Sequence, residues 1–334
     1  MKTNKLTIFV LVVAVVLCLS AGRKRTTIFV IGDSTAAEKS HPESNPERGW
    51  GMMLQGFFDD DILVDNHAVN GRSSKSFLDE GRWQKVLDRI KPGDYVFIQF
   101  GHNDEKLKAD RHTVPGSTFD AYLSRYVGET RAKGGIPVLF SCVVRRNFIH
   151  QVDSTVDDES LRQVVYGDEV VNSDTLVDTH GAYKDAPRNV ARKLGVTFID
   201  ANKITHDLEQ GMGVTGSRKL HVWYRPGEIA SIPKGRKDNT HYNIYGARRV
   251  AGLLADAVGK EIKALRKHVV HFDHVVSTQG RGNYMNLQDA IDAIPTGQKA
   301  RIYVLDGRWT VNKKELRNKK LKFECYEGAR VLVE

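Results

Sequence analysis

Short apolar runs alternate with longer amphipathic stretches from residue 26 to residue 260. Each run leads into a polar or glycine-containing loop, a pattern typical of strands buried in a parallel sheet and separated by helices. The expected strands are Ile28–Ile31, Ile62–Val64, Tyr95–Phe100, Pro137–Phe140 and Val196–Ile199. The alternation predicts an α/β fold, with helices on both faces of a central parallel sheet.

Apolar residues at four-residue spacing predict two of the covering helices. They are Ala182, Ala186, Val190 and Leu194 in the first helix, and Val250, Leu254 and Val258 in the second. Gly195 follows the first set directly and predicts the C-terminal end of that helix. In such a sheet the loops that leave the carboxyl ends of the strands gather along one edge, where ligands bind.

The first 22 residues depart from this pattern. Lys2 and Lys5 precede an apolar run that closes on small residues, which predicts a cleaved signal peptide rather than a retained membrane anchor. We therefore expect an exported protein that is secreted, periplasmic or held at the cell surface. The run is short for a membrane span, so no stable span is expected after the signal is removed.

The pattern also changes near the C-terminal end of the chain. An α/β domain at 23–265 is expected to lead into a basic, histidine-rich linker at 266–274. Residues 275–334 carry strand and turn signals but end inside an apolar run, and a segment of this size has little interior of its own. We expect this segment to be the truncated start of a second domain.

The formal net charge is +9, and removal of the two signal-peptide lysines lowers it to +7. An anionic partner and a merely soluble basic surface explain this balance equally well. Nucleic acid is a poor partner for an exported protein, whereas an acidic polysaccharide fits. The histidines lack H-E-x-x-H spacing and the cysteines lack C-x-x-C spacing, so we expect no metal and no other cofactor.

A serine follows the first expected strand in the stretch "IFVIGDSTAAEK". Ser34 could cap a helix that begins after the strand, or it could act as a nucleophile. Nucleophilic ester cleavage also needs a base, a group that orients this base, and donors for the developing oxyanion. Two further loops offer such donors, with Gly71 in "NGRSS" and Asn103 in "GHND".

Two pairs of residues compete for the roles of base and orienting carboxylate. Asp178 and His180 are two positions apart, and Asp238 and His241 are three positions apart. Either spacing can place both side chains on one side of the backbone, so that one imidazole nitrogen faces the carboxylate and the other faces the serine. The residue pattern alone leaves this choice open.

Four stretches, in this order, resemble the four motif blocks of the SGNH, or GDSL-type, hydrolase superfamily. They are Gly32-Asp33-Ser34-Thr35, Asn70-Gly71-Arg72-Ser73, Gly101-His102-Asn103-Asp104 and Asp238-Asn239-Thr240-His241. The segments "GRSSKSF", "FGHND" and "KDNTHYNIYGA" are more closely similar to rhamnogalacturonan acetylesterases and related pectin acetylesterases. The resemblance implies a flavodoxin-like three-layer α/β/α sandwich with a central parallel sheet.

The resemblance also implies roles for individual residues. Ser34 would be the nucleophile, His241 the base and Asp238 its orienting carboxylate. The backbone N–H groups of Ser34 and Gly71 and the side chain of Asn103 would form the oxyanion hole. The segment "DTHGAYKDAPRNVA" recurs in the family without a role in the triad, so its histidine would be structural or would line the substrate site.

A uronic acid backbone presents carboxylates, which arginine can bind through two parallel hydrogen bonds. The candidate basic partners are Arg72, Lys75, Arg145 and Arg146, and each is explained equally well as a surface charge or an internal ion pair. Arg72 is favoured because it adjoins Gly71. His102 and His180 are candidates for the lining of the pocket, and Trp50 and Trp223 for stacking on sugar rings or packing in the core.

The C-terminal segment has a resemblance of its own. "GRGNYMNLQDAIDAIP" and "ARIYVLDGRWTV" are similar to the opening of pectin methylesterases and other right-handed β-helix proteins that act on pectin. This implies about one solenoid coil without a second active site, because the catalytic aspartates of that family would lie beyond Glu334.

These features predict a carbohydrate esterase that hydrolyses acetyl esters on a pectic polysaccharide, rhamnogalacturonan, through a Ser-His-Asp triad and an acetyl-serine intermediate. A lipase or general esterase of the GDSL type is the nearest alternative. A non-catalytic pectin-binding protein on the same fold is an alternative of a different class.

Overall fold

The computed structural model describes residues 25–150, 171–316 and 318–334. The predicted signal peptide at 1–22 lies outside these residues. Within the described part of the chain, no helix combines the length and the apolar character that a membrane crossing requires.

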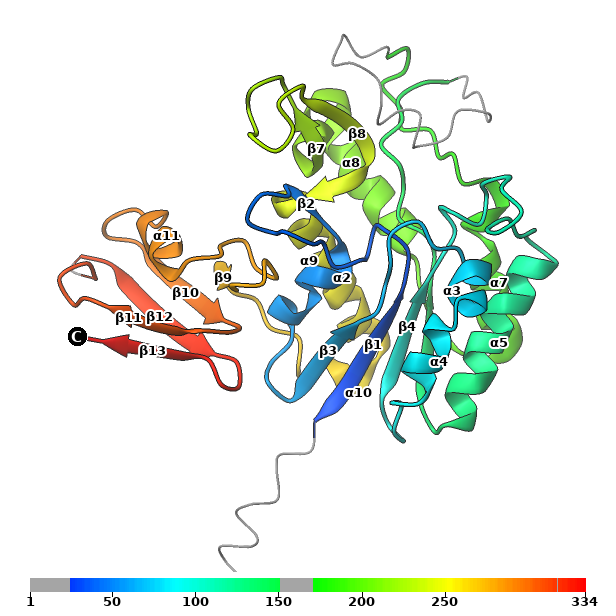
Figure 1. The fold of residues 1–334 in the computed structure, drawn as a ribbon, viewed down its shortest axis with the longest axis horizontal. Helices are drawn as coiled ribbons and strands as arrows, with labels where there is room; N and C mark the ends of the chain where they lie inside the picture. Colours follow the sequence, from blue (N-terminus) through cyan, green and yellow to red (C-terminus); the bar gives the residue numbers. More distant parts are fainter. Residues whose placement is uncertain (1–24, 151–170, 317) are drawn as a thin grey trace, which may run out of the picture.

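A five-stranded parallel sheet forms the centre of the fold, in the order β3-β1-β4-β5-β6 (Figure 1). Its strands are β1 (Thr26–Gly32), β3 (Ile62–Asn66), β4 (Tyr95–Gln99), β5 (Ile136–Phe140) and β6 (Thr197–Ile199). All five predicted strands are therefore present, with small shifts at their ends. Ile28 and Val30 of β1 pack into one core and Phe29 and Ile31 into another, so both faces of the strand are buried. This double burial explains the unbroken apolar runs.

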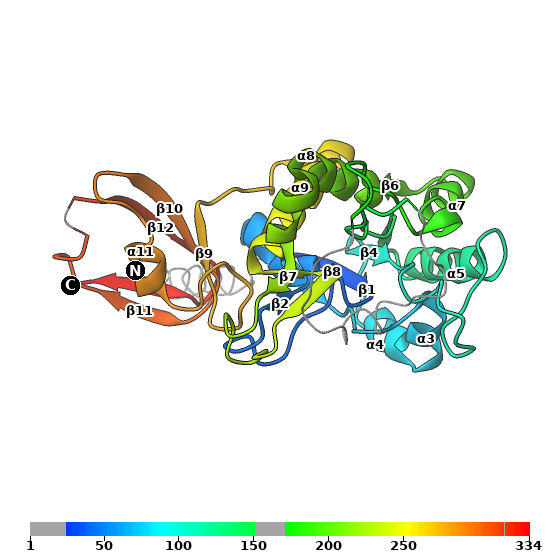
Figure 2. The same ribbon diagram turned by 90° about the horizontal axis from the view of Figure 1, so that it is seen from above.

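Helices cover both faces of this sheet, which confirms the predicted three-layer sandwich (Figures 1 and 2). One face carries α3 (Ser74–Asp79), α4 (Arg82–Leu87), α5 (Thr118–Ala132) and α7 (Ala186–Leu194). The other face carries α2 (Trp50–Met53), η1 (Leu54–Phe57), α8 (Ala201–Ser217), η3 (Arg218–Leu220), α9 (Ile244–Glu261) and α10 (Lys263–Arg266).

The first predicted helix is shorter than its apolar spacing suggests. Ala182 lies in a separate 3-10 turn, η2 (Gly181–Tyr183), and α7 begins only at Ala186. Pro187 occupies the first turn of α7, where a missing backbone N–H costs no hydrogen bond. Gly195 ends the helix in the left-handed conformation with a φ of 59°, as predicted.

A small antiparallel sheet, in the order β2-β8-β7, is a feature that the hydrophobic pattern does not predict. Its strands are β2 (Glu47–Arg48), β7 (His221–Tyr224) and β8 (Arg236–Asn243). β8 leads directly into α9, where the side chain of Asn243 accepts a hydrogen bond of 2.9 Å from the N–H of Gly246. This cap fixes the point at which the strand becomes a helix.

The C-terminal segment forms its own small core beside the α/β domain, on the side of α2 and α9 (Figures 1 and 2). Its elements are β9 (His274–Val276), α11 (Leu287–Asp292), β10 (Lys299–Val304), β11 (Arg308–Val311), β12 (Lys320–Cys325) and β13 (Arg330–Val333). The strands pair in parallel, β12 with β10, β10 with β9, and β11 with β13. The identification of this segment as the start of a pectin methylesterase-like β-helix, and the predicted domain bounds, remain predictions.

Side-chain hydrogen bonds attach this segment to the α/β domain. The hydroxyl of Tyr303 donates to the carbonyl of Phe58 at 3.3 Å, and that of Tyr326 to the carbonyl of Ile62 at 3.1 Å. Each donor comes from the C-terminal segment and each acceptor lies at the start of β3 or just before it. The segment therefore packs against the domain through specific contacts.

A buried carboxylate anchors the loop that follows β4. Asp104 is fully buried and accepts hydrogen bonds from the N–H of Ser74 at 3.1 Å, from its hydroxyl at 2.5 Å, and from the hydroxyl of Thr113 at 2.9 Å. Burial raises the pKa of Asp104 to about 7, although these hydrogen bonds act in the opposite direction. The loop and the start of α3 are thus joined by a group that titrates near neutral pH.

This raised pKa predicts a pH dependence of stability. Folded Asp104 keeps its proton up to about pH 7, whereas the unfolded chain releases it near its ordinary pKa, so its contribution to stability falls as the pH rises between these values. In Asp104→Asn this loss is absent. We expect the free energy of unfolding of the variant, relative to wild type, to rise between about pH 5 and about pH 8 in urea titrations. A difference that does not change with pH would contradict the prediction.

Candidate active site

The fold brings Ser34, in the turn after β1, against two residues of β8 that lie far away in sequence. The Nε2 atom of His241 lies 2.8 Å from the hydroxyl oxygen of Ser34, and its Nδ1 atom lies 3.0 Å from Oδ2 of Asp238. Because a carboxylate only accepts, Nδ1 carries the ring proton and Nε2 accepts from the serine hydroxyl. Ser34 is 9% exposed and the other two are 3% exposed, so bulk water hardly reaches this chain of hydrogen bonds.

The backbone of β8 holds the carboxylate of Asp238 in place. Its Oδ1 accepts hydrogen bonds from the N–H groups of Thr240 at 3.0 Å and His241 at 2.9 Å. This local turn depends on the three-residue spacing, since it lets one carboxylate bind both the backbone and the imidazole of His241. The geometry of base, carboxylate and serine is therefore complete in this pair.

The rival pair is arranged differently. Asp178 accepts from the backbone N–H of His180 at 2.8 Å and from the side-chain amide of Asn202 at 2.7 Å. The ring of His180 faces the carbonyl of Val143 and the carboxylate of Glu105 instead of Ser34. Of the two pairs that the sequence left open, the geometry thus favours Asp238 and His241 as partners of Ser34.

Of the two alternatives for Ser34, the structure does not support the helix cap. A turn follows β1 at residues 34–36, and the next helix, α2, begins only at Trp50. The serine instead lies in a loop whose backbone is held by a buried lysine. The ammonium group of Lys39 donates to the carbonyl of Ser34 at 2.6 Å and to the side-chain oxygen of Asn70 at 2.7 Å.

Lys39 also forms an ion pair of 2.7 Å with Glu47 of β2. One buried ammonium therefore joins the serine turn, the loop of Asn70, and the small sheet that carries Asp238 and His241. The sequence analysis missed this residue. Its neighbours "AAEKSH" contain no motif that marks a buried lysine, and its partners are distant in sequence.

The two loops with the predicted oxyanion donors lie side by side. Gly71 has a φ of 72°, a left-handed conformation that glycine adopts without strain. The side-chain amide of Asn103 donates to the carbonyl of the next residue, Arg72, at 3.2 Å, and only 3% of Asn103 is exposed. This hydrogen bond fixes the amide of Asn103 beside the loop of Gly71.

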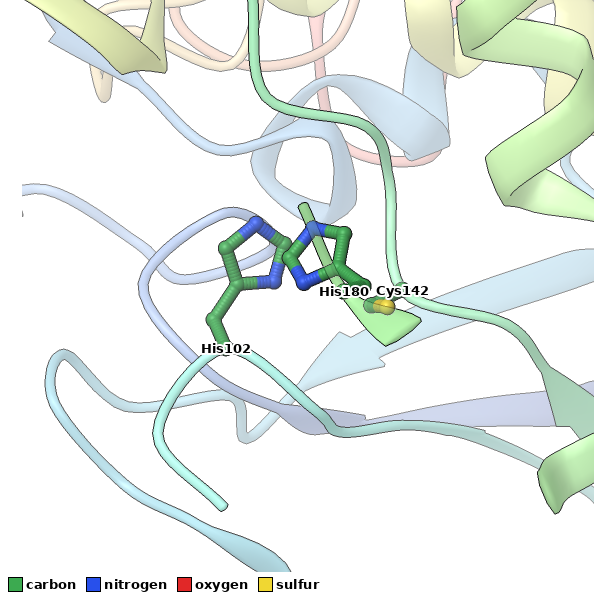
Figure 3. A group of neighbouring side chains, drawn as sticks. All are labelled: His102, Cys142 and His180. Atoms are coloured by element: carbon green, nitrogen blue, oxygen red, sulfur yellow. The ribbon is translucent and has the colours of Figure 1, made fainter. Parts of the chain in front are cut away.

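The rings of His102 and His180 lie against each other, next to Cys142 (Figure 3). Their ring centroids are 4.4 Å apart, and both residues are 2% exposed or less. Both ring nitrogens of His180 face oxygen acceptors, at 3.0 Å and 3.1 Å, an arrangement that suits the protonated ring. Burial and the charge of Arg145 oppose this protonation, but the adjacent carboxylate of Glu105 acts in the other direction, and the pKa of His180 is raised above its usual value.

The pKa of His102 is shifted in the opposite direction from that of His180. Within the described residues, neither ring nitrogen of His102 has a hydrogen-bond partner. Burial, together with the neighbouring charges of His180 and Arg145, lowers the pKa of His102 well below its usual value. The ring is therefore neutral at physiological pH. The expectation that His102 and His180 line the substrate pocket remains a prediction.

The donor atoms of His102, Cys142 and His180 lie within 4.8 Å of one another, a spacing at which side chains can bind a metal. Here, however, both nitrogens of His180 already face oxygen atoms. The guanidinium of Arg145 also lies 3.3 Å from Nδ1 of His180, where its charge opposes a second cation. We therefore assign no metal to these three residues.

The predicted substrate-binding arginines have partners within the protein itself. Arg72 pairs with Glu80 at 3.0 Å and donates to the carbonyl of Asn70, and Arg145 pairs with Glu105. Arg146 is 1% exposed.

The partners of Arg146 are internal as well. It donates to the hydroxyl of Ser217 at 2.9 Å and to the side-chain oxygen of Asn239 at 3.1 Å. Trp50 is fully buried and donates to Gln99 at 2.8 Å, so the suggestion that it stacks on a sugar is wrong.

Comparison with known proteins shows which family the chain belongs to. Residues 30–222 match the GDSL-like Lipase/Acylhydrolase family. The rhamnogalacturonan acetylesterase RhgT of Bacillus subtilis is 36% identical over 259 residues, which are 78% of this chain and 98% of that protein. A rhamnogalacturonan acetylesterase of Emericella nidulans is 44% identical over 238 residues, 70% of this chain and 84% of that protein.

A solved structure supports the fold. The crystal structure of protein YxiM from Bacillus subtilis superposes with a TM-score of 0.53 and 24% identity, and the match covers 71% of this chain and 56% of that chain. The family match and the two acetylesterase relatives confirm the sequence resemblance to the SGNH or GDSL-type hydrolases. The chain belongs to the GDSL-like lipase/acylhydrolase family.

Proposed function

We propose that this protein is a carbohydrate esterase that removes acetyl groups from acetylated rhamnogalacturonan. Two relatives with this activity in their names align over most of their own length, and the family is one of acylhydrolases. The observation that carries the proposal is the hydrogen-bonded chain from Ser34 through His241 to Asp238. It provides a hydroxyl, a base and an orienting carboxylate in the order that ester cleavage requires.

In the first half of the proposed reaction, the hydroxyl oxygen of Ser34 attacks the carbonyl carbon of the acetyl ester. Nε2 of His241 takes the serine proton, and Asp238 stabilises the imidazolium that results. The carbonyl oxygen becomes an oxyanion, for which the N–H groups of Ser34 and Gly71 and the amide of Asn103 are the proposed donors. The ester bond then breaks, and the sugar oxygen leaves with the proton from His241.

In the second half, a water molecule attacks the acetyl group on Ser34. His241 takes a proton from this water and returns it to the oxygen of Ser34 when the acyl bond breaks. Acetate is released, and the serine hydroxyl is restored. The net reaction consumes one ester and one water and yields one sugar hydroxyl and acetic acid, which ionises to acetate.

The proposed substrate also bears on where the protein works. A pectic polymer is too large to cross a membrane, so an enzyme that acts on it has to be exported. The lysines and the apolar run in residues 1–22 support export through a cleaved signal peptide, and we propose a secreted, periplasmic or cell-surface location.

Replacement of the serine tests the proposed nucleophile. We expect Ser34→Ala to lower kcat for acetyl-ester hydrolysis by a factor on the order of 10⁵, because the covalent route is lost. The measurements are the release of acetate from acetylated rhamnogalacturonan and the release of 4-nitrophenol from 4-nitrophenyl acetate. Circular dichroism checks that the variant is folded.

Ser277→Ala is the matched control. Ser277 is fully buried and donates to Asp306 at 2.5 Å, but it lies in the C-terminal segment. Loss of this hydrogen bond should reduce the free energy of unfolding and leave kcat within a factor of about two of the wild-type value. Retention of full activity in folded Ser34→Ala would overturn the proposed mechanism.

A comparison of substrates tests the proposed specificity. We expect kcat/KM for acetate release from acetylated rhamnogalacturonan to exceed that from acetylated xylan and from long-chain 4-nitrophenyl esters by at least about tenfold, a difference of about 1.4 kcal/mol in the transition state. A preference for the long-chain esters would favour the lipase alternative. Binding of the polysaccharide without release of acetate from any substrate would favour the non-catalytic alternative.

A further inference from the structure

Besides Arg72, another arginine, Arg111, lies against the loop of Gly71 in the proposed oxyanion hole. If a methyl group is built on Gly71, it comes within 3.6 Å of Nη1 and 3.9 Å of Cζ of Arg111. The guanidinium of Arg111 therefore lies beside the backbone of Gly71, which is itself half-exposed. Sequence analysis did not single out Arg111, because it belongs to none of the four motif blocks.

The backbone around Arg111 is held in place on both sides. Its N–H donates to the carbonyl of Lys108 at 2.9 Å, and the N–H of Thr113 donates to the carbonyl of Asp104 at 3.0 Å. The side chain of Thr113 adds a hydrogen bond of 2.9 Å to the buried carboxylate of Asp104. The same loop carries Asn103, so the proposed oxyanion donor and the guanidinium are positioned by one anchored segment.

The guanidinium of Arg111 lies farther from its paired carboxylate than do those of Arg72 and Arg145, which were predicted from sequence. Among the residues that the structure describes, its nearest carboxylate is Asp110, at 3.6 Å from Nε, and the side chain of Asp110 is 68% exposed. This separation is longer than a hydrogen bond. Arg72, by contrast, has Glu80 at 3.0 Å. The side chain of Arg111 is 22% exposed, so it is partly shielded from water but still accessible to a ligand.

The position of this charge suggests its ligand. If the ester carbonyl binds at Gly71, the sugar unit that carries the acetyl group lies next to this glycine. In a pectic backbone that unit, or its neighbour, is a uronic acid with a carboxylate a few bonds away from the esterified hydroxyl. A guanidinium offers two parallel N–H donors to a carboxylate.

We infer that Arg111 binds the carboxylate of a uronic acid unit at or next to the acetylated sugar. This assignment rests on the proposed function and makes Arg111 a specificity-determining residue of the same site. It also differs from the sequence prediction, which favoured Arg72.

The experiment compares Arg111→Gln with wild type on three substrates. They are acetylated rhamnogalacturonan as the free acid, the same polymer with its carboxylates methyl-esterified, and 4-nitrophenyl acetate. We expect kcat/KM on the free acid to fall by about 10- to 100-fold, mainly through KM, because a hydrogen bond to a charged group is lost. On the two uncharged substrates the change should stay within a factor of about three.

Two further measurements make the result specific. Arg111→Lys keeps the charge but loses the paired geometry, so we expect an intermediate loss on the free acid. Wild type itself should lose about tenfold or more in kcat/KM when the carboxylates are methyl-esterified, a result that does not depend on the folding of any variant. Arg125→Gln is the matched control, because Arg125 is an exposed arginine of α5 that pairs with Glu129 at 2.8 Å. It should leave all three values unchanged.

Equal losses on charged and uncharged substrates would overturn the inference, since Arg111 would then act on the ester or on the loop. No loss on the free acid would overturn it as well. These outcomes differ from a failure of the proposed function, in which wild type would release no acetate from rhamnogalacturonan at all.

Discussion

The hydrogen bond of 2.8 Å between Ser34 and His241 is the contact on which the proposed chemistry depends. It joins the turn after β1, the first strand in the sequence, to β8, which lies about 200 residues later in the chain. The antiparallel pairing of Glu47 with Asn243 and of Arg48 with Tyr242 brings β8 to this place. The small sheet therefore acts as the support that carries the base to the nucleophile.

Lys39 holds the serine turn in place relative to the small sheet. A buried ammonium is costly unless all its hydrogens are paired, and here they face Ser34, Asn70 and Glu47. These partners belong to the loop of the nucleophile, the loop beside Gly71 and the small sheet. The buried charge thus holds three separate segments at fixed distances, which is what a preorganised site requires.

The sequence predicted the parts of the fold whose burial leaves a local signal. Strands such as Tyr95–Gln99 are apolar on both faces, and Gly195 marks a helix end through its backbone conformation. β8 reads "RKDNTHYN", without apolar alternation, because hydrogen bonds to distant partners hold it in place. Lys39 and Arg111 were missed for a similar reason. Their surroundings come from loops far apart in sequence, and no spacing rule reports such contacts.

The most direct test of this account is the mass of the protein during turnover. A reaction with 4-nitrophenyl acetate, quenched in acid within the first turnovers and digested, is analysed by mass spectrometry. The account predicts one added acetyl group on the peptide that contains Ser34, and its disappearance once the substrate is consumed. Steady release of acetate without an acetyl group on Ser34, or with the group on another residue, would contradict it.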